Sequence, residues 1–148
     1  MFSIPPLYPL LLSLAVLIVC IVTDLKCRQI SPLVCLAFLL LSLFDSGRNY
    51  LASCGGAFLG FLPLFIAALF GSGGGGDALL AGVLGFILPF RFAAYLLLTA
   101  SFSYMLVLAL AAWKTGNRKI QLPYAPFLGF GWLLVLMTAL FLDGGTAL

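Results

Sequence analysis

Apolar residues occur in six runs along this chain, and every charged residue lies outside these runs. Long apolar runs are typical of helices that cross a bilayer, and a full crossing needs about 20 residues. The pattern therefore predicts an all-α integral membrane protein, a bundle of six transmembrane helices. The predicted segments are residues 7–23, 33–44, 50–70, 78–90, 92–113 and a last run that ends at Phe141.

Two of the runs, 33–44 and 78–90, are shorter than a full crossing. They extend into the flanking loops, tilt less, or lie where the bilayer is thin. A five-span alternative merges 78–90 with 92–113 into one broken segment, but Pro89 followed by Arg91 favours two separate helices. The first run has no basic region before it and no small-residue cleavage site after it, so we expect a retained helix rather than a signal peptide.

The composition agrees with a membrane protein, since 64% of the residues are hydrophobic and 7% are charged. A soluble domain carries about a quarter charged residues. No stretch has the composition of a separate soluble domain, so one transmembrane domain, residues 1–148, is expected. The four cysteines form no CxxC pair and are interpreted as small buried hydrophobic residues. They are Cys20, Cys27, Cys35 and Cys54.

The basic residues predict how the bundle is oriented. With six spans, the loops 24–32, 71–77 and 114–121 share one face and carry five of the seven Lys and Arg residues. The other face, with both termini, carries Arg48 and Arg91. The excess of positive charge on cytoplasmic loops places the first face in the cytoplasm and both termini outside it. Basic residues scattered through short loops indicate membrane topology rather than binding of nucleic acid.

The chain has no histidine and no glutamate, so its acidic side chains are four aspartates. The lack of histidine excludes Ser-His-Asp and Cys-His catalysis, HExxH zinc peptidases and most catalytic zinc sites. We predict no cofactor and no metal. In the orientation above, Asp24 and Asp77 fall on the cytoplasmic face, whereas Asp45 and Asp143 fall on the other.

Asp24 closes the first predicted helix, and Asp77 opens the fourth on the same side. If these helices are neighbours, the two carboxyl groups can face each other across a small aqueous pocket. Two carboxylates in one site cannot both ionise cheaply, so one keeps a proton. The ionised group can take a proton from water, and the protonated group can polarise a peptide carbonyl and later donate to the leaving amine. The pair therefore permits aspartic proteolysis.

Asp77 follows a glycine-rich loop, residues 71–76 (GSGGGG). Glycine lets another backbone approach closely, which an extended substrate peptide would need. The loop formally matches GxGxxG, but no strand precedes it, no acid follows at the ribose distance, and no Lys-Ser/Thr pair follows as in a P-loop. Simpler interpretations stay open: Asp77 as a helix N-cap, Asp24 as an interfacial acid paired with Lys26 or Arg28, and the loop as a flexible turn. The placement of both acids on one face favours a site.

Five aromatic residues with a polar edge lie near the ends of the predicted spans. Tyr and Trp are enriched at membrane–water interfaces, where their amphipathic rings lie at the level of the headgroups. We therefore expect interfacial anchors at Tyr8, Tyr50, Trp113, Tyr124 and Trp132.

Three stretches of the chain together resemble the type IV prepilin peptidase family, the GxGD membrane aspartic peptidases that cut leader peptides from pilins and pseudopilins. Residues 24–31 (DLKCRQIS) are similar to the first motif, an Asp followed by a basic stretch and Ile-Pro or Ile-Ser. Residues 74–77 (GGGD) match the GxGD motif, which presenilin and signal peptide peptidase share more distantly. Residues 122–127 (LPYAPF) are similar to the proline-framed start of the last helix. With the six-span layout, the resemblance covers nearly the whole chain.

The resemblance implies that Asp24 and Asp77 are the catalytic pair and that Gly74 and Gly76 shape the supporting loop. It implies a multi-pass protein of the bacterial inner membrane, whose substrate is a prepilin with a short basic leader ahead of a hydrophobic helix. Two departures matter. Leu79 stands where the family often has Lys, and the first loop is too short for the CxxC insertion that long members carry and that is associated with N-methylation. We therefore expect the short form, a peptidase without methyltransferase activity, as in members serving Flp-type or related pili.

The charges of the cytoplasmic face bear on how a substrate would be recognised. Its five basic residues outnumber its two acids, so the face would not attract a basic leader by net charge. Recognition should then rest on packing of the substrate's apolar helix between the spans. The alternative from another class is a non-catalytic membrane transport protein, or an assembly protein for pili or secretion. In such a protein Asp24 and Asp77 would bind an ion or a proton.

Overall fold

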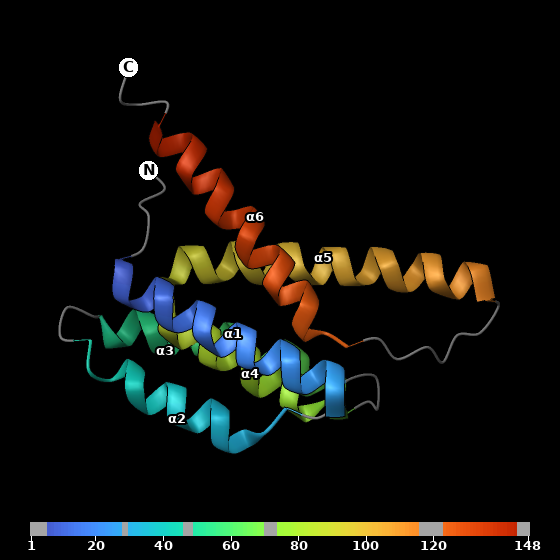
Figure 1. The fold of residues 1–148 in the computed structure, drawn as a ribbon, viewed down its shortest axis with the longest axis horizontal. Coiled ribbons are helices and arrows are strands. Elements are labelled where there is room, and N and C mark those ends of the chain that lie inside the picture. The colour runs from blue at the N-terminus through green and yellow to red at the C-terminus, as the bar shows by residue number, and fades with distance from the viewer. Residues whose placement is uncertain (1–5, 28–29, 46–48, 70–73, 116–122, 145–148) are drawn as a thin grey trace.

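The computed structural model describes residues 6–27, 30–45, 49–69, 74–115 and 123–144, and the regular secondary structure in these ranges is α-helical (Figure 1). The predicted all-α class is therefore confirmed for the described part of the chain. Each of the six helices coincides with one of the apolar runs. They are α1 (Leu7–Cys27), α2 (Pro32–Ser42), α3 (Tyr50–Leu69), α4 (Gly75–Ile87), α5 (Phe90–Thr115) and α6 (Ala125–Gly144).

The helix ends differ from the ends of the apolar runs in ways that matter for the two acids. Helix α1 continues past Asp24, so this residue lies inside the last turn rather than after it. Helix α4 begins at Gly75, which puts Asp77 in its first turn. Helices α4 and α5 are separate because Leu88 has an extended backbone (φ −89°, ψ 153°), the conformation that a following proline favours.

Three of the helices are long and apolar enough to cross a membrane: Leu7–Lys26, Tyr50–Leu69 and Phe90–Lys114. The apolar parts of α2, α4 and α6 are shorter. Large hydrophobic side chains are exposed along the outside of the bundle, and an extensive exposed apolar surface marks contact with a membrane or a partner. Together these features indicate a membrane protein.

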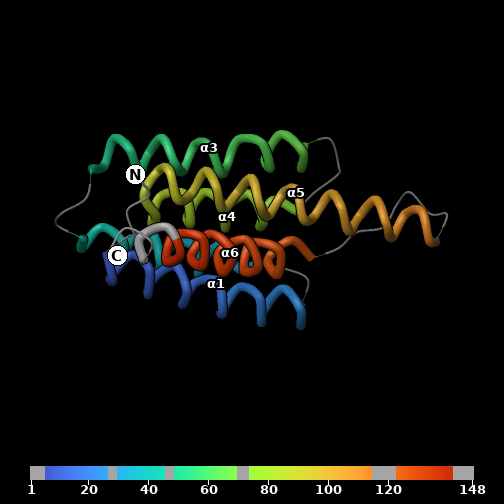
Figure 2. Tube along the Cα trace, turned by 90° about the horizontal axis from the view of Figure 1, so that it is seen from above, coloured from blue at the N-terminus to red at the C-terminus, as the bar shows by residue number. Residues whose placement is uncertain are grey.

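Helix α4 lies at the centre of the bundle and contacts each of the other five helices. Figure 2 shows it between α3 on one side and α1 and α6 on the other. Residues 80–88 are all buried, which explains why this 13-residue helix is apolar on every side rather than along one stripe. The helix that carries Asp77 is therefore held from all directions.

Helices α3 and α4 approach so closely that backbone touches backbone. A Cβ atom added to Gly56 would overlap the carbonyl oxygen of Gly85, and one added to Gly85 would overlap that of Gly56. A Cβ atom on Gly60 would overlap the carbonyl of Ala81. Small residues permit such approach, and Gly56 and Gly60 provide it here. Gly55 does not take part in this contact, since an added Cβ would have no neighbour nearer than 3.8 Å.

Two of the five predicted interfacial aromatic residues are instead inside the bundle. Trp132 is 3% exposed and Tyr124 is 4% exposed. The indole Nε1 of Trp132 donates a hydrogen bond to Ser13 Oγ at 2.9 Å, which joins α6 to α1. A buried Trp or Tyr is stable when its polar edge has such a partner, and the sequence does not reveal that partner. The interfacial role of the other three aromatic residues stays a prediction.

Candidate active site

Asp77 is the third residue of α4, at the end of the bundle where α1 ends. The N-cap of α4 is Gly74, whose backbone is extended (φ −87°, ψ 134°), so the N-cap interpretation of Asp77 is wrong. The carboxyl group of Asp77 instead accepts a hydrogen bond from the backbone N–H of Gly74. An acid at the third position that reaches back to the N-cap satisfies one of the unpaired N–H groups at a helix start.

The glycines before Asp77 differ in how much space surrounds them. A Cβ atom on Gly76 would lie 2.9 Å from Cβ of Ile30 and 3.4 Å from its carbonyl oxygen. A Cβ atom on Gly74 would lie 3.1 Å from Oδ2 of Asp77, whereas one on Gly75 would meet nothing within 4 Å. Since Ile30 lies between α1 and α2, the start of α4 packs directly against the connection that follows the helix of Asp24. The loop residues 71–73 lie outside the described part of the chain.

Asp24 is buried, with 6% of its surface exposed. Its Oδ2 accepts a hydrogen bond from the backbone N–H of Ala125 at 3.4 Å. Ala125 is the first residue of α6, so the carboxyl group lies at the positive end of that helix. A pairing with Lys26 does not account for this burial, because Lys26 is exposed, and Arg28 lies outside the described residues.

The two acids are close enough to affect each other's ionisation. Asp77 precedes the apolar segment 78–90, and burial raises the pKa of its carboxyl group to about 6. The negative charge of Asp24 raises this pKa further, while the hydrogen bond from Gly74 opposes the shift. The surroundings of Asp77 therefore favour the protonated form of its carboxyl group more than those of a free aspartate do.

Asp77 opens onto a cavity of about 400 Å³ between α3, α4, α5 and the start of α6. Ligand sites in proteins are commonly several hundred Å³, mostly apolar, with a few placed polar groups. This cavity has that character. Its lining residues are Leu64, Ala67, Gly74, Asp77, Ser101, Tyr104, Met105, Leu108 and Tyr124. The volume and the lining suit a short segment of polypeptide.

Tyr124 is a site residue that the sequence interpretation missed. Its hydroxyl and Ser101 Oγ are 3.0 Å apart, and its ring lies edge-on to that of Tyr104, with centroids 5.3 Å apart. Burial raises the pKa of the Tyr124 hydroxyl, the hydrogen bond with Ser101 lowers it, and the charge of Asp77 raises it. The available signal was its position between two prolines in the stretch 122–127, next to the residue that binds Asp24.

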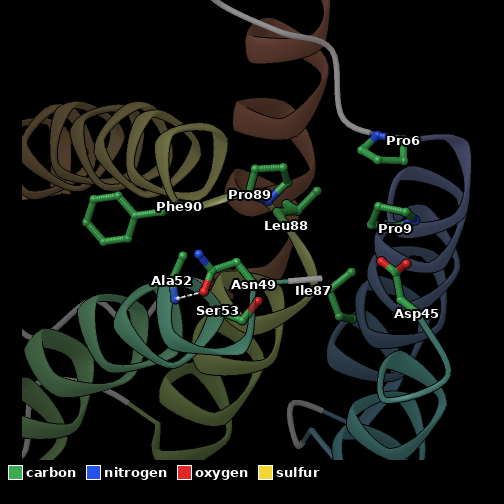
Figure 3. A pocket seen from close by; sticks show the side chains of 10 residues that line it. All are labelled: Pro6, Pro9, Asp45, Asn49, Ala52, Ser53, Ile87, Leu88, Pro89 and Phe90. Atoms are coloured by element: carbon green, nitrogen blue, oxygen red, sulfur yellow. Dashed lines mark hydrogen bonds between the residues drawn. The ribbon is translucent and has the colours of Figure 1, made fainter. Parts of the chain in front are cut away.

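A second cavity, of about 240 Å³, lies at the other end of the bundle (Figure 3). Asp45 is the charged side chain among the residues that line it, and three prolines form much of its wall. Asn49 accepts a hydrogen bond through Oδ1 from the backbone N–H of Ala52 at 3.4 Å, which caps α3. Among the described residues that line this cavity one carries a carboxyl group, whereas Asp77 has the charge of Asp24 nearby.

The model of the type IV leader peptidase family matches residues 11–110. The matched part contains both Asp24 and Asp77 and ends before α6, although α6 supplies the N–H that binds Asp24. Comparison with curated proteins and with solved structures gave no match.

Proposed function

Because the chain belongs to the type IV leader peptidase family, we propose that it is an aspartic endopeptidase. Its substrates are type IV prepilins or pseudopilins, whose basic leader it removes at the cytoplasmic face of the bacterial inner membrane. The observation that carries this proposal is the placement of Asp24 and Asp77 at one end of the bundle, near enough for the charge of Asp24 to raise the pKa of Asp77, with Asp77 facing a cavity. Peptidase activity without histidine needs another acid–base pair, and two carboxyl groups supply one.

In the proposed reaction the pair starts with one proton, on Asp77. Asp24 takes a proton from water as the water oxygen attacks the carbonyl carbon of the scissile bond, and Asp77 gives its proton to the carbonyl oxygen. The product of this step is a neutral gem-diol. Asp77 then removes a hydroxyl proton from the gem-diol. In contrast to the expectation from the sequence, Asp24, and not the initially protonated Asp77, protonates the leaving nitrogen as the C–N bond breaks. The two products are an acid and an amine, and the pair returns to its starting state.

In the proposed topology, the chain crosses the membrane six times and both termini lie outside the cytoplasm. The substrate's basic leader then stays in the cytoplasm, and its apolar helix packs against the spans. Helix α5 offers a surface for this packing, since its 26 residues extend past the other helices at its C-terminal end (Figures 1 and 2). Met105 lines the cavity and is also 64% exposed, so the cavity continues onto the outer face of α5 beside Phe102 and Leu106.

Cleavage in membranes is the direct test of this function. We expect co-expression with a small protein that has a basic leader and a hydrophobic N-terminal helix to give the shortened form. Mass spectrometry of the new N-terminus would identify the bond cut. A panel of such substrates that all keep their leaders in the presence of the wild-type chain would contradict the proposal.

The raised pKa of Asp77 predicts the pH dependence of the reaction. Since Asp77 must hold a proton, kcat/KM should fall as the pH rises through about 6. It should also fall in acid, when the pair binds a second proton and no group can accept one from water. The measurement is the initial cleavage rate over a series of buffers, and Asp77→Glu should shift both limits because the pair titrates as a unit. A flat profile across the range in which carboxyl groups titrate would contradict this chemistry.

The three glycines before Asp77 predict a graded series of alanine variants. Gly76→Ala pushes a Cβ atom against Ile30 and should lower kcat/KM by about 10-fold or more, since small displacements of catalytic groups are costly. Gly74→Ala displaces the Asp77 carboxyl group and should act in the same direction. Gly75→Ala is the matched control and should cleave like the wild type, because its Cβ atom meets open space. Wild-type kcat/KM in all three variants would exclude a supporting role for Gly74 and Gly76.

A further inference from the structure

The cavity beside Asp77 has a polar wall that the proposed reaction does not use. This wall consists of the hydroxyl groups of Ser101 on α5 and Tyr124 just before α6, here called the hydroxyl pair. We propose that the hydroxyl pair binds the backbone of the substrate and holds the scissile peptide bond over Asp77. This inference rests on the proposed function and adds to it two substrate-binding residues.

The hydrogen-bonding capacity of the pair exceeds what the protein uses. Each hydroxyl has one donor hydrogen and two acceptor lone pairs, and the bond between the two oxygens, at 3.0 Å, consumes one hydrogen and one lone pair. Within the described part of the chain, one donor hydrogen and several lone pairs are left beside the cavity. Its other walls include the apolar side chains of Leu64, Ala67 and Leu108. When a ligand displaces water from such a site, the remaining capacity needs polar partners.

An extended peptide supplies those partners. Every residue of a substrate backbone other than proline presents one N–H donor and one C=O acceptor, the complement of a paired donor and acceptor on the wall. Such recognition does not depend on the substrate's side chains. The pair therefore suits a leader peptide that must unfold locally to present one bond.

The position of the Tyr124 hydroxyl is fixed from two sides. Its ring packs edge-on against Tyr104, which in turn packs edge-on against Phe127 with centroids 5.4 Å apart. The next residue, Ala125, donates its backbone N–H to Asp24. One peptide bond thus connects the substrate-binding hydroxyl to the residue that holds the other catalytic acid. A rigid arrangement of this kind lowers the entropic cost of bringing the reacting groups together.

Tyr124→Phe and Ser101→Ala test the inference because each removes one hydroxyl and keeps most of the packing. We expect each to lower kcat/KM for a prepilin by about 10-fold, mainly through a higher KM. The double variant should lose little more than the worse single variant, since the two hydroxyls act as one unit. Ser101→Thr keeps the hydroxyl and should restore most of the activity, which a defect in packing alone would not predict.

Matched controls exist for both changes. Tyr8→Phe removes the hydroxyl that bonds the carbonyl of Leu41 far from the site, and Ser103→Ala removes one that bonds Thr99 on its own helix. Both should keep the wild-type kcat/KM. Ser101→Thr keeps the hydroxyl that bonds Tyr124 and should have the melting temperature of the wild type in detergent, so the comparison with Ser101→Thr carries the test even if Tyr124→Phe or Ser101→Ala is less stable.

The outcomes separate this inference from the function on which it rests. If the wild type cleaves a prepilin and Asp77→Asn does not, the proposed function stands. Unchanged kcat and KM in both Tyr124→Phe and Ser101→Ala would then overturn the hydroxyl pair alone. If the wild type cleaves none of the substrates, the peptidase proposal and the inference are both overturned.

Discussion

Asp24→Asn and Asp77→Asn should each lower the rate of leader cleavage by about 10³-fold, to the limit of detection in cells. Asparagine has nearly the shape of aspartate but cannot exchange a proton in this range of pH. Asp24→Asn leaves no base to take the proton from water, and Asp77→Asn leaves no acid to protonate the carbonyl oxygen. The assay is the fraction of a co-expressed prepilin that is shortened, compared at equal amounts of peptidase in the membrane.

These variants should fold, which makes their loss of activity informative. In Asp24→Asn, the oxygen of the new side-chain amide can still accept the hydrogen bond that the backbone N–H of Ala125 donates. Asp45→Asn at the other end of the bundle is the matched control and should cleave normally. Asp143→Asn should behave in the same way. Normal cleavage by either Asp24→Asn or Asp77→Asn would show that the reaction does not use this pair.

Gly56→Ala should destabilise the folded chain by about 3 kcal/mol, near the upper end of what overpacking costs. The added methyl group would overlap the carbonyl oxygen of Gly85, which is backbone and cannot rotate away. Helices α3 and α4 must then separate, and α4 carries Asp77. The measurement is unfolding of the purified protein in mild detergent, followed by circular dichroism.

Gly55→Ala is the control for this change, one residue away on the same helix. Its methyl group would have no neighbour nearer than 3.8 Å, so it should cost little or be slightly stabilising, since alanine favours helix over glycine. The two variants add the same atoms and change the same helix propensity. Equal stability of the pair would mean that α3 and α4 are not in backbone contact at Gly56.

The helices could be predicted from the sequence because membrane-spanning helices are long uninterrupted apolar runs. The residues at which the helices end could not be predicted in the same way, since a helix can continue past a polar residue that has a hydrogen-bond partner. Asp24 lies inside α1 for this reason: its carboxyl group meets the first N–H of α6. The break at Pro89 was predictable because proline constrains the backbone of the residue before it.

The two acids could be predicted as a pair from topology, because both fall at helix ends on one face. The hydroxyl pair could not, since it joins the middle of α5 to the start of α6 and neither residue has a motif that marks the contact. The burial of two aromatic side chains could not be predicted from the sequence either. Tyr124 and Trp132 have the chemistry of interfacial anchors, and their burial depends on Ser101 and Ser13, which only the folded arrangement brings near.

The hydrogen bond between Asp24 and Ala125 determines the earliest time at which the site can be complete during synthesis of the chain. Its partners are 101 residues apart, at the end of the first helix and the start of the last. At a translation rate of about 5–20 residues per second, Ala125 is made roughly 5–20 s after Asp24. Through that interval Asp24 lacks its α6 donor, and the wall that carries Tyr124 is absent. A ribosome-bound chain stalled before α6 should therefore be inactive, and docking of the last helix becomes the step that switches the peptidase on.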